Sequence, residues 1–128
     1  MAAILVIEDD EQVRVLAESI LQEAGYKTLT AGTVAESLAL LDSDESINLL
    51  FVDIALEGDS HGGLDLAKQA VAARPTLAVI YTTGRGVTDG MRALFVDRFS
   101  FVSKPYSAAD LLAAVKNALQ VRQLRAPK

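Results

Sequence analysis

Acidic, hydroxyl and lysine side chains follow four apolar segments of this sequence, at the point where each segment ends. Glu8-Asp9-Asp10-Glu11 comes after the first segment, and Asp53 ends a later one. Two further segments are followed by Thr82-Thr83-Gly84 and by Ser103-Lys104-Pro105. Carboxylates at close range repel one another unless a cation joins them, and an all-oxygen set of ligands favours Mg²⁺. These residues therefore point to metal-assisted chemistry on phosphate.

The chemistry that this set supports is covalent transfer of a phosphoryl group. A lysine and a threonine hydroxyl that face the metal would hold phosphoryl oxygens. Asp53 would then be the nucleophile and form an aspartyl phosphate. Taken singly, each residue has a simpler interpretation: the acids cap a helix, Thr83 is a turn residue and Lys104 is solvated. The hypothesis depends on the four positions meeting in space.

Short apolar runs alternate with stretches of helical periodicity along the whole chain. Strands are expected at 3–7, 28–31, 48–53, 77–82 and 99–102, and helices at about 13–24, 34–41, 63–74, 87–96 and 111–119, with a tail from about 121. Strands that read as continuous Val/Ile/Leu runs, each followed by a helix, are buried on both faces and lie parallel. The expected fold is an α/β three-layer (βα)5 sandwich around a flavodoxin-like, doubly wound, five-stranded parallel sheet. In such a sheet the carboxyl ends of the strands form one crevice, so the four positions should meet there.

Length and composition exclude several classes of protein. The 128 residues fit one domain spanning 1–128, and 51% hydrophobic with 23% charged residues is typical of a globular protein. There is no cysteine, which excludes disulfides, zinc–thiolate sites and a thiol nucleophile. The net charge of -5 argues against direct nucleic acid binding. No apolar run approaches the roughly 20 residues that span a bilayer, and no secretion signal is evident, so a cytoplasmic location without a membrane partner is expected.

These motifs resemble the receiver domain of two-component response regulators, from Ala3 to about Arg122. The resemblance depends on four motifs: Ile4-Leu5-Val6-Ile7-Glu8-Asp9-Asp10, Phe51-Val52-Asp53-Ile54, Thr82-Thr83-Gly84 and Lys104-Pro105-Tyr106. It implies that Asp53 is the phosphoacceptor and forms the catalytic set with Lys104 and Thr83. It also implies phosphate binding by Thr83, Gly84 and Lys104, a switch formed by Thr83 and Phe101, and Mg²⁺ ligands from Glu8, Asp9, Asp53 and the backbone carbonyl of Ala55.

The resemblance also implies partners. The phosphoryl donor would be a sensor histidine kinase or a histidine phosphotransfer protein, in a Mg²⁺-dependent reaction, and the reader an unidentified downstream protein. Homodimerisation would use the face formed by residues 87–96, 99–102 and 111–119. The domain would not be an enzyme in the usual sense, because it catalyses only phosphorylation and dephosphorylation of its own aspartate. No DNA-binding or enzymatic output segment follows the matched region, so we expect signalling through a changed protein-binding surface.

One segment departs from the family pattern. The stretch 57–63, Glu-Gly-Asp-Ser-His-Gly-Gly, is longer than usual by about two residues and lacks the proline that normally follows the phosphoacceptor. His61, the single histidine, lies in this stretch, and a lone histidine in a polar, glycine-rich loop is expected to be a solvated residue.

Three alternatives share features with the receiver hypothesis. Phosphatases of the haloacid-dehalogenase type need a second aspartate two positions after the nucleophile, where this chain has Ala55. A flavodoxin-like FMN carrier needs a phosphate loop after the first strand, where four acids would repel the phosphate. A phosphorylation-independent, receiver-like adaptor module would keep the fold without the chemistry, and it remains the alternative function.

Overall fold

The computed structural model describes residues 2–84, 87–96 and 99–125, in which strands and helices alternate. The strands are β1 (Ala3–Ile7), β2 (Lys27–Ala31), β3 (Leu49–Asp53), β4 (Ala78–Thr83) and β5 (Phe99–Ser103). The helices are α1 (Glu11–Glu23), α2 (Val34–Leu41), α3 (Gly62–Ala73), α4 (Asp89–Arg92) and α5 (Ala108–Arg125).

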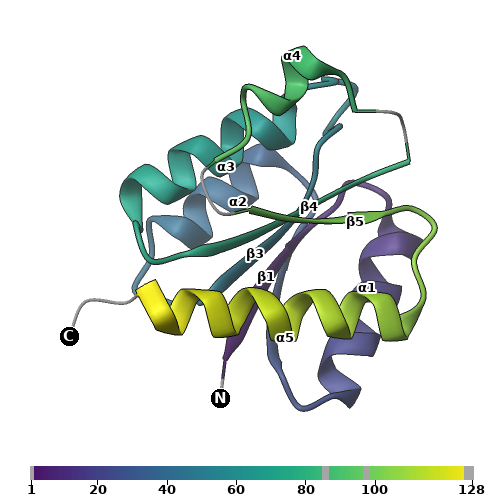
Figure 1. Cartoon of the computed structure of the whole chain (residues 1–128), viewed down its shortest axis with the longest axis vertical. Helices are drawn as coiled ribbons and strands as arrows, with labels where there is room; N and C mark the ends of the chain where they lie inside the picture. Colours follow the sequence, from purple (N-terminus) through teal and green to yellow (C-terminus); the bar gives the residue numbers. More distant parts are fainter. Residues whose placement is uncertain (1, 85–86, 97–98, 126–128) are drawn as a thin grey trace.

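The five strands form one parallel sheet in the order β2-β1-β3-β4-β5. In Figure 1, α1 and α5 lie on one side of the sheet, and α2, α3 and α4 lie on the other. This confirms the three-layer, doubly wound fold expected from the sequence. Because the chain runs outward from β1 to β2 and then returns to β3 on the other side of β1, the carboxyl ends of β1 and β3 border the crevice.

Alternate residues of each central strand supply the two halves of the core. In β1, Ile4 and Val6 pack in a cluster with Leu111 of α5, while Leu5 and Ile7 pack in a second cluster with Leu64 of α3. Successive side chains of a strand point to opposite faces, so a strand covered on both faces must be apolar at every position. This requirement explains the uninterrupted apolar runs and makes the polar residues at the strand ends conspicuous.

The fourth helix is shorter than the sequence pattern predicted. The expected helix at 87–96 is reduced to α4, Asp89–Arg92, which contains Gly90, a residue that weakens helices. Beyond it, the N–H of Leu94 donates to a carbonyl only three residues back, at 3.0 Å, which forms a tight turn. The N–H of Val96 then donates to the hydroxyl of Tyr81 in β4 at 3.0 Å. Contact with the sheet therefore replaces the helical hydrogen bonds in this segment.

The last helix is longer than expected at both ends. It begins at Ala108, where the hydroxyl of Ser107 accepts the N–H of Asp110 at 3.0 Å, and it continues to Arg125. The expectation of a tail from about 121 was therefore wrong up to Arg125, and residues 126–128 lie outside the described residues. Gln, Arg and Leu at 122–125 are good helix formers, which explains the extension. Within the described part of the chain, no helix, α5 included, is long and apolar enough to cross a membrane.

Candidate functional site

The four consecutive acids after β1 divide into two pairs. The side chain of Asp10 accepts two backbone N–H groups of the first turn of α1, at 2.9 and 3.2 Å, so it is the N-cap of that helix. Glu11 lies in the same turn, where its charge suits the helix dipole. Glu8 and Asp9 instead belong to a cluster with Asp53. The helix-capping interpretation therefore applies to half of the acidic run.

Two buried carboxylates share one lysine at the carboxyl edge of the sheet. Glu8 directly follows β1 and is 4% exposed, and Asp53 ends β3 and is 6% exposed. Lys104, which directly follows β5, places its Nζ 2.8 Å from Asp53 Oδ2 and also pairs with Glu8 Oε1. The backbone N–H of Lys104 donates to the carbonyl of Thr83 at 3.1 Å. The fold thus brings together residues that are 96 positions apart in the chain.

Backbone groups orient each carboxylate of the cluster. Asp53 Oδ1 accepts the N–H of Ala55 at 3.1 Å, and Asp9 Oδ2 accepts the N–H of Glu57 at 3.0 Å. Glu8 Oε2 accepts the backbone N–H two residues further on, at 3.2 Å. Since these donors belong to the turns that follow β1 and β3, the geometry of the cluster depends on those turns.

Burial and the neighbouring charges shift the pKa values of Glu8, Asp9 and Lys104 in this cluster. Burial raises the pKa of Glu8 to about 7, against the lowering effect of Lys104 and with a further rise from the charge of Asp53. Burial also acts to raise the pKa of Asp9, but hydrogen bonds from Glu8 and from the backbone of Glu57 outweigh it and lower that pKa. Burial acts to lower the pKa of Lys104, but its hydrogen bonds to Asp53 and Glu8 raise it overall. The lysine therefore stays charged, whereas the ionised form of its partner Glu8 is disfavoured.

The cluster fits a hard divalent cation. Glu8, Asp9 and Asp53 each offer a carboxylate oxygen, and these oxygens lie within 4.8 Å of one another. Among the described residues, Lys104 is the cation that forms salt bridges with Glu8 and Asp53, which leaves an excess of negative charge. Oxygen ligands of this kind suit Mg²⁺. These three side chains would hold the ion. Ala55, partly buried directly beyond β3, remains a predicted ligand through its carbonyl.

The remaining predicted site residues lie on the neighbouring strands. Thr83 is buried at the end of β4, and a Cβ atom built on the adjoining Gly84 would lie 3.8 Å from Lys104 Cβ. Phe101 in β5 is half-buried and pairs in register with Tyr81 of β4. It packs against the core cluster on the α2 and α3 side of the sheet. The structure therefore brings Thr83 and Gly84 to the site. Phe101 lies inside β5, before the end of the strand, which Lys104 directly follows.

Sequence reasoning missed two residues beside Asp53. A Cβ atom on Gly63 would lie 1.9 Å from the carbonyl oxygen of Asp53, so only glycine lets the start of α3 approach the end of β3 this closely. The Gly62-Gly63 pair before an apolar helix was the available signal. Thr82 pairs in register with Asp53, and its buried hydroxyl has no hydrogen bond partner among the residues that the structure describes. No sequence signal distinguishes Thr82 from an ordinary strand residue.

His61 takes part in hydrogen bonds of its own loop. Its Nδ1 lies 3.0 Å from Ser60 Oγ, and its backbone N–H donates to Asp59 Oδ1 at 2.9 Å. The residue precedes α3 without capping it through its side chain, and it is partly buried. His61, expected to be a solvated residue, is therefore partly exposed and held within its own loop.

The fold and the site together define a phosphoacceptor signalling domain, in which an aspartate at the carboxyl edge of a parallel sheet lies against a lysine and two further acids. The family described as "Response regulator receiver domain" matches residues 4–116. The chain belongs to this family.

Relatives and solved structures agree with this assignment. The chain is 29% identical to the nitrogen assimilation regulatory protein NtrX of Azorhizobium caulinodans over 123 residues, which are 95% of this chain and 27% of that protein. It is also 29% identical to protein PilG of Pseudomonas aeruginosa over 88% of this chain and 84% of PilG. A CheY-like receiver domain protein from Methanospirillum hungatei superposes with a TM-score of 0.87 at 27% identity, covering 98% of this chain and 99% of that one. NtrX from Brucella abortus gives 0.85 at 30% identity, with 98% of this chain matched to 28% of NtrX.

This membership assigns the general function. The chain is a receiver domain with a phosphoacceptor role in two-component signalling. Receiver domains are in general signalling modules without enzymatic activity, they interact with histidine kinases or phosphotransfer proteins, and they bind Mg²⁺ at an acidic pocket. The chain spans about a quarter of the NtrX relatives that it matches, at 27% of the first. The phosphatase and FMN-carrier alternatives lose their support.

Proposed function

We propose that Asp53 accepts the phosphoryl group from a phosphohistidine of a sensor kinase or phosphotransfer protein. The observation that carries this proposal is the position of its carboxylate, which is buried, 2.8 Å from Lys104 Nζ and beside Glu8. A buried carboxylate is costly unless it is paired. Lys104 pairs with it without blocking both oxygens, because the lysine bonds Oδ2 whereas Oδ1 accepts the N–H of Ala55.

The proposed reaction is a displacement at phosphorus. An oxygen of Asp53 forms a bond to phosphorus while the bond from phosphorus to the donor imidazole nitrogen breaks, and the imidazole leaves with that electron pair. With acetyl phosphate as donor, a phosphorus–oxygen bond breaks and acetate leaves. No proton needs to be removed from Asp53, so the chain contributes position and charge and supplies no general base.

Lys104 and Thr83 would bind the transferred group. The lysine ammonium already lies against Asp53 and would pair with a phosphoryl oxygen, and the hydroxyl of Thr83 at the end of β4 would donate to another. Gly84, which directly follows Thr83 and lies beside Lys104, would also bind the phosphoryl group. A magnesium ion held by Glu8, Asp9, Asp53 and the Ala55 carbonyl would supply positive charge that offsets the carboxylates and the phosphoryl oxygens.

The phosphoryl group would be sensed through Thr83 and Phe101. A new acceptor near Thr83 favours a conformation in which its hydroxyl moves inward, and Phe101 then turns from half-buried to buried. Leu94, which follows α4, is 43% exposed, and Phe99, the first residue of β5, is 38% exposed. These two side chains would contact a downstream protein or a second copy of the chain. We expect a beryllofluoride phosphate mimic to shift amide NMR signals of α4, β5 and α5 in the wild type, but only those near Asp53 in Thr83→Ala. Shifts of equal extent in both proteins would contradict the switch.

Phosphorylation by acetyl phosphate tests the central assignment. Intact-mass measurement should show one phosphate on the wild type in the presence of Mg²⁺ and none on Asp53→Asn. The matched control is Asp65→Asn, because Asp65 is an exposed carboxylate of α3 outside the cluster, and it should be phosphorylated like the wild type. Phosphorylation of Asp53→Asn at the wild-type rate would overturn the assignment. A wild type that takes up no phosphate would support the adaptor alternative.

A further inference from the structure

The loop between β3 and α3 contains a tight turn that the resemblance to receiver domains did not explain. Leu56 and Asp59 exchange backbone hydrogen bonds of 3.0 and 2.8 Å around the two residues between them. Those residues, Glu57 and Gly58, have φ values of 52° and 79°. Among the described residues, Glu57 is the one non-glycine residue with positive φ. A side chain at such a position is unfavourable, so a glutamate there calls for a compensating interaction.

Glu57 is bonded on two sides. Its backbone N–H donates to Asp9 Oδ2 at 3.0 Å, and its Oε1 accepts the N–H of Val34 at 2.6 Å. Val34 is the first residue of α2, where backbone N–H groups lack helical partners and the helix dipole favours a negative charge. Glu57 therefore joins the acidic cluster to the start of a helix that contributes no residue to that cluster.

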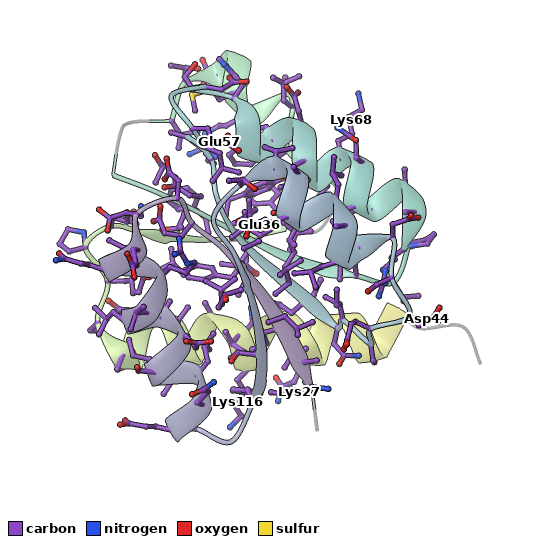
Figure 2. The ribbon with its side chains drawn as sticks, turned by 180° about the vertical axis from the view of Figure 1, so that it is seen from behind. Lys27, Glu36, Asp44, Glu57, Lys68 and Lys116 are labelled. Atoms are coloured by element: carbon purple, nitrogen blue, oxygen red, sulfur yellow. The ribbon has the colours of Figure 1, made fainter. Side chains whose placement is uncertain are left out.

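Other labelled charged groups in Figure 2 lie elsewhere. Figure 2 shows Glu57 in the upper part of the molecule, with Glu36 of α2 below it, whereas the exposed Lys27 and Lys116 lie at the lower end. Glu36 also bonds the start of α2, but its Oε1 accepts the N–H of Gly32 at 3.0 Å, which lies before the helix. A proline at 57 could neither donate the N–H to Asp9 nor adopt positive φ.

We propose that Glu57 is a positioning residue for the metal site. Its backbone N–H aims the Asp9 carboxylate at the cation, and its side chain fixes the turn against α2, so that binding of Mg²⁺ is transmitted to the start of α2. The proposal rests on the proposed function, in which Asp9 is a ligand of Mg²⁺. Groups that hold a metal ligand in orientation commonly affect metal affinity as strongly as some ligands do.

Two substitutions separate the side chain from the turn. Glu57→Gly keeps the N–H that binds Asp9 and favours positive φ, so it removes only the bond to Val34. Glu57→Gln keeps an Oε1 acceptor and should restore most of the effect. The control is Glu36→Gln, which makes the same change at another glutamate bonded near the start of α2 but outside the acidic cluster. Thermal melts establish that each full-length variant is folded.

The measurement is an NMR titration of the full chain with MgCl₂, which gives both the dissociation constant and the response of the Val34 amide. In Glu57→Gly we expect the dissociation constant to rise about three- to tenfold and the Val34 amide to lose its Mg²⁺-dependent shift. Glu57→Gln and Glu36→Gln should stay within about twofold of the wild type. A purely structural capping role would lower the melting temperature of Glu57→Gly and leave its dissociation constant at the wild-type value, and that result would overturn the proposal.

The titration also separates this proposal from the proposed function. If Mg²⁺ fails to bind the wild type, or binds Asp9→Ala equally well, the proposed metal site itself is wrong. If the wild type binds Mg²⁺ through Asp9 and Glu57→Gly binds it with equal affinity, only the role of Glu57 is wrong.

Discussion

Neutralising Glu8 should stabilise the metal-free protein at alkaline pH and have a smaller effect in acid. The pKa of Glu8 rises from 4.5 to about 7 because the carboxyl is buried. Between those values the folded chain keeps a proton that the unfolded chain has lost, so stability falls as pH rises through this window. Each pKa unit corresponds to about 1.4 kcal/mol, so the wild type should lose about 2–3 kcal/mol of unfolding free energy between pH 5 and pH 8. Glu8→Gln removes this ionisation and should remove that loss.

The pH window distinguishes Glu8 from its neighbours. Asp9 has a lowered pKa and therefore affects stability at more acidic pH. Lys104 has a raised pKa and therefore affects stability at more alkaline pH. The assay is urea unfolding in EDTA, followed by circular dichroism at pH 5, 6, 7 and 8. Glu11→Gln is the matched control, because Glu11 lies in the same acidic run but is exposed in the first turn of α1. Its curve should keep the wild-type slope.

Magnesium should weaken this dependence of stability on pH. An ion that binds the folded state favours ionised Glu8, so saturating MgCl₂ should reduce or abolish the loss of stability above pH 5 in the wild type. The reasoning is refuted if Glu8→Gln in EDTA loses stability between pH 5 and pH 8 as steeply as the wild type. In that case the burial of Glu8 would not control its ionisation.

Two substitutions next to Asp53 test the packing of the site. Gly63→Ala should destabilise the fold by about 3 kcal/mol or more in urea unfolding, because its Cβ would lie 1.9 Å from the Asp53 carbonyl oxygen, whereas Gly90→Ala in α4 should be neutral or stabilising by up to about 1 kcal/mol. Equal effects of the two alanines would contradict the close approach. Thr82→Val should raise the unfolding free energy by about 1 kcal/mol, since the buried Thr82 hydroxyl has no partner among the described residues, and a clear decrease would mean that the hydroxyl is hydrogen bonded in solution.

The fold class and the central site residues could be predicted from the sequence. Five apolar runs that alternate with amphipathic helices predict a parallel sheet, and in such a sheet residues that follow the strands share one edge. Asp53 and Lys104 could be paired on that basis, because the rule concerns strand ends and needs no knowledge of loop conformation. The acidic run was ambiguous, since both capping and metal binding favour acids at the start of a helix.

Local pattern failed where tertiary contacts compete with it. Residues 87–96 have helical periodicity, yet the bond from Val96 to the Tyr81 hydroxyl and the packing of Phe95 on Tyr81 shorten α4 to four residues. Periodicity describes only neighbours in the chain, and here partners from β4 determine the conformation.

By itself, the sequence predicted the ends of β1 and β3 correctly and those of β4 and β5 to within one residue, and so indicated which side chains can meet at the carboxyl edge of the sheet. Only the tertiary structure decided how those side chains are held. The two extra residues of the 57–63 loop had no interpretation until positive φ at Glu57 placed its N–H on Asp9 and its carboxylate on α2. Likewise, the pKa of Glu8 depends on how completely the fold buries it and on its contacts with Lys104 and Asp53, and these are properties of packing that no local sequence pattern contains.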